Sequence, residues 1–91
     1  MLEIVQTRTF KKHLRLCLTR GWDMSTLDEV VSMLHREEAL PEKYRDHALS
    51  GDRIGQRDCH IEPGWVLIYR IREDVLILQL LDMGSHANLS R

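Results

Sequence analysis

The sequence predicts an α+β domain in which a helical hairpin packs on one face of a mainly antiparallel four-stranded sheet. The patterns along the chain follow the order β-α-α-β-β-β. The last three strand patterns are joined by short turns, as in an antiparallel meander. The length of 91 residues fits one domain, residues 1–91, and the second face of the sheet is left for a functional site.

The first two elements are a strand and a helix. Residues 2–6 are rich in apolar and β-branched side chains, which is typical of a strand. Residues 7–20 carry apolar side chains at helical spacing, and Gly21 follows as a residue that readily ends a helix with positive φ. The apolar positions of this helix are Phe10, Leu14, Cys17 and Leu18.

A second helix is predicted to begin near Asp23 or Ser25 and to be bounded by Pro41. Residues 25–28 approximate a capping box, in which the first and fourth side chains bond to the open backbone groups of the first turn. Because few residues join the two helices, they form an antiparallel hairpin. The apolar face of the second helix comprises Met24, Leu27, Val30, Val31 and Leu34.

An ordered loop is expected over residues 41–52, followed by a strand over residues 54–61. Polar and apolar side chains alternate along that strand, so Asp58 and His60 point to one side and Arg57 to the other. The sequence Glu62-Pro63-Gly64 is typical of a turn.

Two further strands complete the predicted sheet. Residues 65–71 are rich in Val, Ile, Tyr and Trp, and residues 73–74 form a tight connection. Residues 75–81 are almost all apolar, as in a central strand that is covered on both faces. Residues 84–89 are expected to leave the sheet.

The composition bounds the compartment and the partners. The net charge is −1, whereas a protein that binds nucleic acid without other partners is usually basic. The composition therefore disfavours a dedicated nucleic-acid-binding protein. It remains compatible with a local basic patch on the surface. Cys17 and Cys59 match no zinc or redox spacing and are interpreted as reduced core residues. The acidic start and the absence of a long apolar run predict a cytoplasmic protein without a membrane segment.

Three histidines in the C-terminal half are the main candidates for chemistry. His47, His60 and His86 fall at predicted loops and strand ends, and histidine can take and give a proton near neutral pH. Each also has a plainer interpretation, as a surface residue for His47 and His86 or a hydrogen-bonded structural residue for His60. No HExxH spacing occurs, so neither a metal nor a cofactor is expected.

Metal-free RNA cleavage needs a base for the 2′-OH, an acid for the 5′-oxygen and cations for the phosphate. Two histidines can fill the first two roles, and Asp58 can orient one of them because it lies two residues from His60 on the same side of a strand. Candidate RNA contacts are Trp65, which is also a candidate core residue, and the cations Arg57, Arg53 and Lys43.

Three motifs resemble those of the YafQ-type toxins of the RelE superfamily. They are Asp46-His47-x-Leu49-x-Gly51, Arg57-Asp58-Cys59-His60-Ile61-Glu62-Pro63-x-Trp65-x-Leu67-Ile68-Tyr69, and Gly84-Ser85-His86. The resemblance implies a RelE-like fold and His47, His60 and His86 as the acid–base residues. It also implies Asp58 as an acidic site residue and Trp65 as the tryptophan beside the site.

The resemblance further implies a toxin of a type II toxin–antitoxin system, an endoribonuclease that depends on the ribosome and cuts mRNA in the A site. The implied partners are the ribosome with its mRNA and a cognate antitoxin, which wraps a segment over the toxin. Operator DNA is reached only through the antitoxin.

Three positions depart from the family pattern. Gly64 stands where a carboxylate is common, Asp82 where an arginine is usual, and Ser90 where a phenylalanine is frequent. The first two changes predict a weakened nuclease. They leave an alternative open, a RelE-fold binding protein without nuclease activity. It is either a decayed toxin that acts as an antitoxin-binding co-repressor or a ParE-like gyrase inhibitor.

Overall fold

The computed structural model describes residues 1–85 and Leu89, and within this part of the chain it contains two α-helices and one five-stranded sheet. The helices are α1 (Arg8–Thr19) and α2 (Ser25–His35). The strands are β1 (Glu3–Gln6), β2 (His47–Ala48), β3 (Arg57–Glu62), β4 (Trp65–Arg72) and β5 (Ile77–Ser85). Two short 3₁₀ turns, η1 (Glu42–Tyr44) and η2 (Gly51–Arg53), flank β2.

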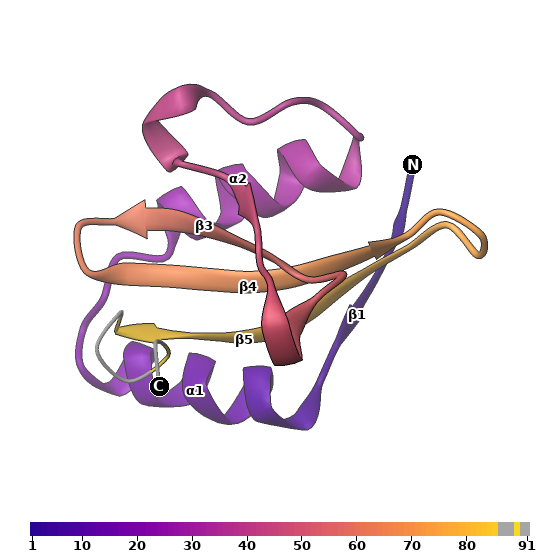
Figure 1. The fold of residues 1–91 in the computed structure, drawn as a ribbon. Coiled ribbons are helices and arrows are strands. Elements are labelled where there is room, and N and C mark those ends of the chain that lie inside the picture. Colours follow the sequence, from indigo (N-terminus) through magenta and orange to yellow (C-terminus); the bar gives the residue numbers. More distant parts are fainter. Residues whose placement is uncertain (86–88, 90–91) are drawn as a thin grey trace.

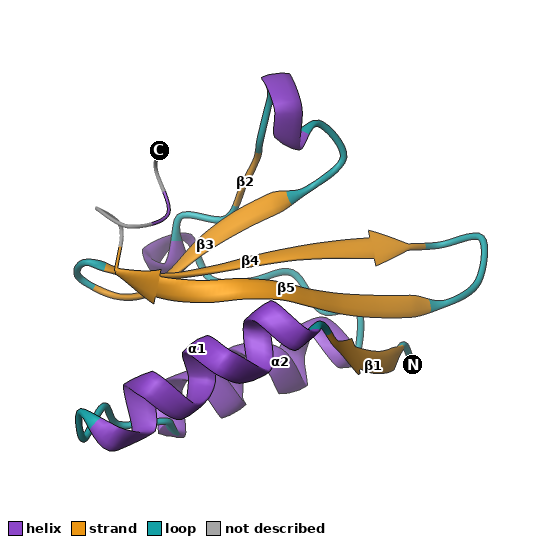
Figure 2. Cartoon of the chain, turned by 90° about the horizontal axis from the view of Figure 1, so that it is seen from below, coloured by secondary structure: helices purple, strands orange, loops and turns teal. Residues whose placement is uncertain are grey.

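The molecule has two layers, with both helices on one face of the sheet (Figure 1). Figure 2 shows the helices below the sheet and the segment that contains β2 above it. The predicted α+β class and the helical hairpin on one face are therefore confirmed. The strand order is β1-β5-β4-β3-β2, in which β1 runs parallel to β5 and the other neighbours are antiparallel.

The sheet has one strand more than predicted. His47 and Ala48 form β2 inside the expected loop, since they pair with Asp58 and Arg57 of β3. A strand of two residues is too short to show an alternating pattern, so it could not be recognised in the sequence. At the other end, β5 runs to Ser85, and the expected departure from the sheet at Gly84 is wrong.

The strand buried on both faces is β4, not the segment 75–81. The first five residues of β4 are all buried, whereas Val75 and Leu76 are exposed in the turn that precedes β5. The order of the strands explains the difference, because β4 is the middle strand of the sheet. An apolar run by itself does not distinguish a central strand from a turn with exposed apolar side chains.

The two helices begin in different ways. The Thr7 side chain accepts a hydrogen bond from the Phe10 amide at 3.0 Å, which caps α1 as a threonine can. At α2 the predicted capping box does not form, since the N-cap residue Met24 makes no side-chain bond. Asp23 instead accepts a hydrogen bond from the Ser25 amide at 2.9 Å. The helix ends at His35, well before Pro41.

The core lies between the helices and the sheet, with Phe10, Val30 and Leu67 almost fully buried. Cys17 and Cys59 are free and belong to this core, as predicted. Burial raises the pKa of both thiols, well above the ordinary range for Cys59, which keeps them protonated and unreactive at neutral pH. Among the described residues no helix is long and apolar enough to cross a membrane.

Candidate active site

Strand β3 holds an acid–histidine pair on the side of the sheet away from the helices. His60 Nε2 lies 3.8 Å from Asp58 Oδ1, which confirms the predicted common side of the two residues. Asp58 is buried, and its Oδ1 accepts no hydrogen bond from the described part of the chain. A buried carboxylate oxygen in this state is costly unless a polar partner compensates it, and His60 is the neighbouring side chain placed to do so.

A second histidine lies beside this pair. His47 is directly opposite Asp58 in the register of β2 and β3, and its ring centroid is 6.5 Å from that of His60. His47 Nδ1 is 2.7 Å from the carbonyl oxygen of Arg45. A carbonyl only accepts, so Nδ1 carries the proton and donates it, which leaves Nε2 of a neutral ring as a proton acceptor.

A polar clamp fixes the chain just before His47. The Asp46 carboxylate accepts hydrogen bonds from Arg57 Nε at 3.3 Å and Nη2 at 3.2 Å, and from the Tyr69 hydroxyl at 2.5 Å. The bond to Asp46 raises the pKa of Arg57. Burial, and then the same carboxylate, raise the pKa of Tyr69 far above its ordinary value, so its hydroxyl remains a donor. The clamp anchors the short strand β2 to β3 and β4.

Asp46→Asn is expected to loosen this clamp. The change removes the negative charge shared by Arg57 and Tyr69, and we expect it to lower the free energy of unfolding by about 1–2 kcal/mol. The expected loss is this small because the Arg57 side chain is 39% exposed, so that solvent screens its attraction to Asp46. Urea unfolding measures the loss. Asp74→Asn removes a carboxylate from an exposed pair with Arg72 and is the matched control, with no measurable change. Equal stability of the two variants would contradict a clamp at Asp46.

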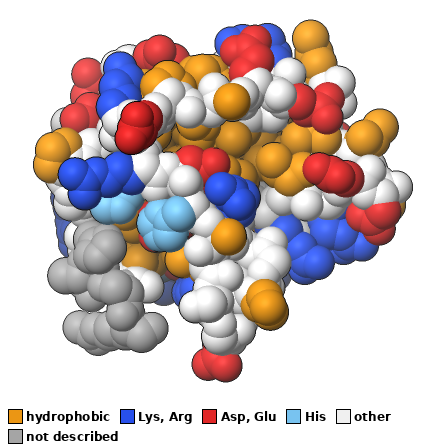
Figure 3. Space-filling view, turned by 45° about the horizontal axis from the view of Figure 1, so that its top comes forward, with side chains coloured by type: hydrophobic (Ala, Val, Ile, Leu, Met, Phe, Trp, Pro, Cys, Tyr) orange, Lys and Arg blue, Asp and Glu red, His pale blue; other side chains and the backbone are white. Residues whose placement is uncertain are grey.

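Basic side chains border the histidine pair. His60 lines an open cavity of about 590 Å³ together with Lys43, Arg45 and Gly64. The Lys43 ammonium lies 5.1 Å from the centre of the Tyr44 ring, which helps hold it at this rim. Figure 3 shows two histidine side chains next to each other on one face of the molecule, with basic side chains beside them. This arrangement suits a phosphate group.

Two residues expected to contact RNA also have structural positions. Trp65 is only 4% exposed and packs against Trp22, with ring centroids 4.8 Å apart. Arg57 points away from Asp58 and His60, as predicted, and its guanidinium is bound by Asp46. We therefore assign both residues to stabilising the fold around the site. The sequence analysis had kept a core role open for Trp65.

The remaining predicted residues lie apart from the pair or outside the description. Arg53 lines a second cavity, at the end of β5, together with Asp82. His86 and Ser90 lie outside the described residues. In residues 1–85 and Leu89, no group of three or more metal-binding side chains comes together.

The structure also identifies residues that the sequence analysis passed over. Arg45 has a left-handed backbone, with φ 49°, and presents its carbonyl to His47. His13 of α1 bonds to Asp82 across 69 positions of the chain. Such a distant pair leaves no local pattern. The position of Arg45 beside the His47 motif was the one available signal.

Comparison with known proteins identifies the family. A family model described as "Bacterial toxin of type II toxin-antitoxin system, YafQ" matches residues 2–91. The chain belongs to the YafQ family. The mRNA interferase toxin YafQ of Escherichia coli K12 is 34% identical over 88 residues, which cover 96% of this chain and 94% of that protein. The resemblance seen in the three sequence motifs is thus confirmed.

Solved YafQ-like structures share the fold. A metal-bound toxin from Helicobacter pylori is 37% identical with a TM-score of 0.92, and the match covers 98% of this chain and 99% of that one. YafQ in the DinJ–YafQ complex of E. coli is 33% identical with a TM-score of 0.88, and 98% of each chain is covered. The helices and the sheet described above are therefore those of YafQ toxins.

Proposed function

We propose that this chain is the toxin of a type II toxin–antitoxin pair and an endoribonuclease that cleaves mRNA in the ribosomal A site. The observation that carries the proposal is the cluster of His47, His60 and Asp58, in which one histidine is set up as a base and the other as an acid. The relatives named mRNA interferase support the same activity.

The proposed reaction is an attack of the ribose 2′-oxygen on the neighbouring phosphorus. Nε2 of His47 takes the proton of the 2′-OH, because its Nδ1 is occupied by the Arg45 carbonyl. The bond from phosphorus to the 5′-oxygen breaks, and the His60 imidazolium gives that oxygen a proton. The products are a 2′,3′-cyclic phosphate and a 5′-OH.

The charged residues around the two histidine rings have separate roles in the proposed reaction. The Asp58 carboxylate lies 3.8 Å from His60 Nε2 and is placed to orient the ring. Lys43 and Arg45 line the cavity that His60 borders and are placed to offset the negative charge that builds on the phosphate. The ring centroids of His47 and His60 are 6.5 Å apart, a separation that suits a phosphate bound between the base and the acid. We also propose His86 as a third acid–base residue, on the strength of the sequence motif.

The partners are proposed by analogy with the relatives. YafQ of E. coli has been solved in complex with DinJ, and we propose that a cognate antitoxin covers this chain in the same way. Operator DNA would then be reached through the antitoxin alone, and the toxin would act in the cytoplasm, where ribosomes are. Asp82 stands where an arginine is usual, and its negative charge was a reason to expect a weakened nuclease. His13 binds this carboxylate, which makes that reason weaker.

Primer extension on a defined mRNA tests the proposal. The purified protein is added to the same mRNA either on translating ribosomes or alone, with and without a chelator that removes transition metals but leaves Mg²⁺. We expect cuts at in-frame A-site positions, only on ribosomes, that persist in the chelator. Cleavage of the naked mRNA would contradict ribosome dependence, loss in the chelator would contradict metal-free chemistry, and no cleavage would contradict the nuclease itself.

Gly64→Asp is expected to increase cleavage several-fold. Gly64 lines the cavity of His60 and Lys43, so a carboxylate there is placed to orient a protonated histidine. A side chain at this position meets no atom within 4 Å, but the backbone φ of +79° costs a residue with a Cβ about 1 kcal/mol. Gly64→Asn, with the same shape and no charge, is the matched control in single-turnover cleavage. Equal rates for both variants would contradict a role for the charge.

A further inference from the structure

A second cavity, separate from the histidine pair, lies at the open edge of β5. Strand β1 pairs only with Ile77–Leu80, so the rest of β5 has no strand on that side and lies against α1. The cavity measures about 380 Å³, within the range of about 300–1,000 Å³ typical of small-molecule sites. Its polar and aromatic lining comprises His13, Arg20, Trp22, Arg53, Asp82 and Ser85.

We propose that this cavity binds one base of the mRNA next to the cleavage position and that Asp82 determines which base is accepted. The inference rests on the proposed nuclease function and adds a specificity residue to it. Asp82 would favour adenine, cytosine or guanine, which carry an exocyclic amino group, over uracil.

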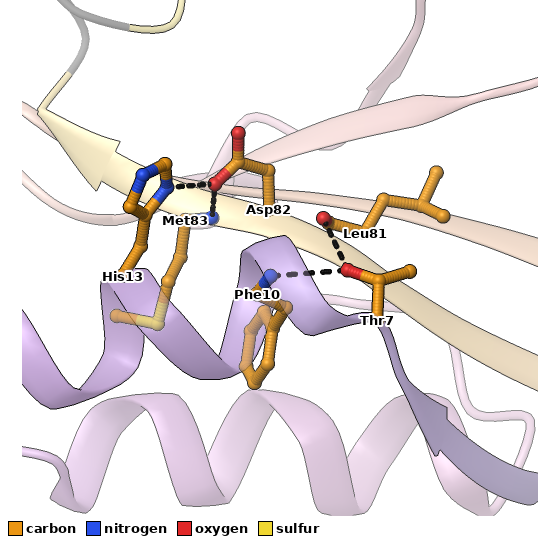
Figure 4. A network of polar contacts seen from close by, with 6 residues as sticks. All are labelled: Thr7, Phe10, His13, Leu81, Asp82 and Met83. Carbon is orange, nitrogen blue, oxygen red and sulfur yellow. Dashed lines mark hydrogen bonds and ion pairs between the residues drawn. The ribbon is translucent and has the colours of Figure 1, made fainter.

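The Asp82 carboxylate is held in one orientation. Its Oδ1 lies 2.5 Å from His13 Nδ1 and accepts a hydrogen bond from the Met83 amide at 2.8 Å. Figure 4 shows the second oxygen pointing away from His13 and from α1. The side chain is 13% exposed and lines the cavity, so its carboxylate is a nearly buried, fixed acceptor there.

A fixed carboxylate distinguishes bases by their donors. The amino groups of cytosine, adenine and guanine donate to it, and acceptance from the cytosine amino group is a known mode of readout. Uracil has a single ring N–H with a carbonyl oxygen on each side, and the carboxylate repels those oxygens. His13 is a positioning residue in this arrangement, because its ring nitrogen holds the Asp82 carboxylate at the cavity wall.

The other lining groups suit a nucleotide. The cations Arg20 and Arg53 form no ion pair within the described part of the chain, and Arg53 uses one N–H for the Gln56 side chain at 3.0 Å. They are therefore available to the phosphates on either side of a base. Trp22 is half-buried, and its contact with Trp65 holds its ring at the cavity wall, where a base can stack on it.

The cavity is close to the proposed chemistry along the sheet. Ser85 lines it, pairs with Trp65 of β4 and directly precedes His86. Trp65 in turn pairs with Glu62 of β3, two residues after His60. Two strand spacings of about 4.8 Å thus separate the cavity from the strand of His60, which is within the span of two nucleotides.

The test uses Asp82→Asn, which keeps the shape of the side chain but presents an amide. Its NH₂ can donate to uracil, so the preference against uracil is expected to fall about tenfold. His13→Gln, which frees the carboxylate to rotate, is a second variant with a smaller shift. Asp74→Asn makes the same charge change at the far turn of the sheet and is the matched control. Cleavage is read by sequencing an mRNA library randomised at the A-site codon on translating ribosomes.

Binding of cytidine 3′-monophosphate and uridine 3′-monophosphate to the isolated protein, followed at the Trp22 indole by NMR, separates this inference from the nuclease proposal. In the wild type, we expect cytidine 3′-monophosphate to shift the Trp22 signal more than uridine 3′-monophosphate does. In Asp82→Asn, we expect the two ligands to give equal shifts. If the wild type cleaves no mRNA, a preference for cytidine 3′-monophosphate in this binding experiment still supports the base site. Equal binding of the two nucleotides by the wild type overturns the base site. Cleavage with an unchanged base profile in both variants overturns it as well.

Discussion

Replacing His60 by Gln is expected to reduce the rate of A-site cleavage by about 10²–10⁴-fold, the usual contribution of a positioned acid or base. Glutamine keeps a polar side chain near Asp58 but carries no proton to give to the leaving 5′-oxygen. The buried Asp58 carboxylate then also loses its histidine neighbour. The fold is expected to remain, because β3 keeps its pairing with both neighbouring strands.

The measurement is single-turnover cleavage on stalled ribosomes with saturating toxin, together with a thermal unfolding curve for each variant. His35→Gln is the control, since His35 is a histidine of α2, on the opposite face, whose ring is hydrogen-bonded to the Leu2 carbonyl. It should cleave at the wild-type rate. A His60→Gln protein that folds and cleaves normally would remove His60 from the chemistry.

Replacing Trp65 by Ala is expected to lower the free energy of unfolding by about 3–5 kcal/mol, as for other large buried aromatic residues. The indole is 4% exposed and packs on Trp22 in the core, so its removal leaves a cavity at the start of β4. A domain of this size has a total stability of about 5–14 kcal/mol, at roughly 0.05–0.15 per residue. The variant therefore loses a large share of its stability.

Trp65→Phe is a matched comparison. The indole Nε1 is buried with no hydrogen-bond partner in the described part of the chain, so phenylalanine removes an unsatisfied donor together with some volume. We expect a loss of about 1–2 kcal/mol. Urea unfolding gives both values. Unchanged stability of Trp65→Ala with lost cleavage would instead assign Trp65 to RNA contact.

The sequence predicted the parts of this molecule that have a local period. The helical spacing of Phe10, Leu14 and Cys17 predicted α1, and the alternation around Cys59 placed Asp58 and His60 on one side. These signals are readable because each residue's direction follows from its immediate neighbours.

The missed features depend on distant partners. β2 exists because two residues meet β3, and the double burial of β4 follows from its central place in the sheet. The Asp46 clamp joins residues 11 and 23 positions apart, and the bond from His13 to Asp82 spans 69. No spacing rule links such residues before the fold is known.

The parallel pairing of β1 with β5 has a consequence for the timing of toxicity. Residues 3–6 find their strand partner only in residues 77–80, near the opposite end of the sequence. A nascent chain still lacking those residues cannot close its sheet, and closing such a long loop is slow. The histidine pair is therefore expected to take its working geometry only after residues 77–80 have left the exit tunnel. Under the proposed function, the ribosome that makes the chain is protected until then. Chains cut short before residue 77 are expected to be harmless.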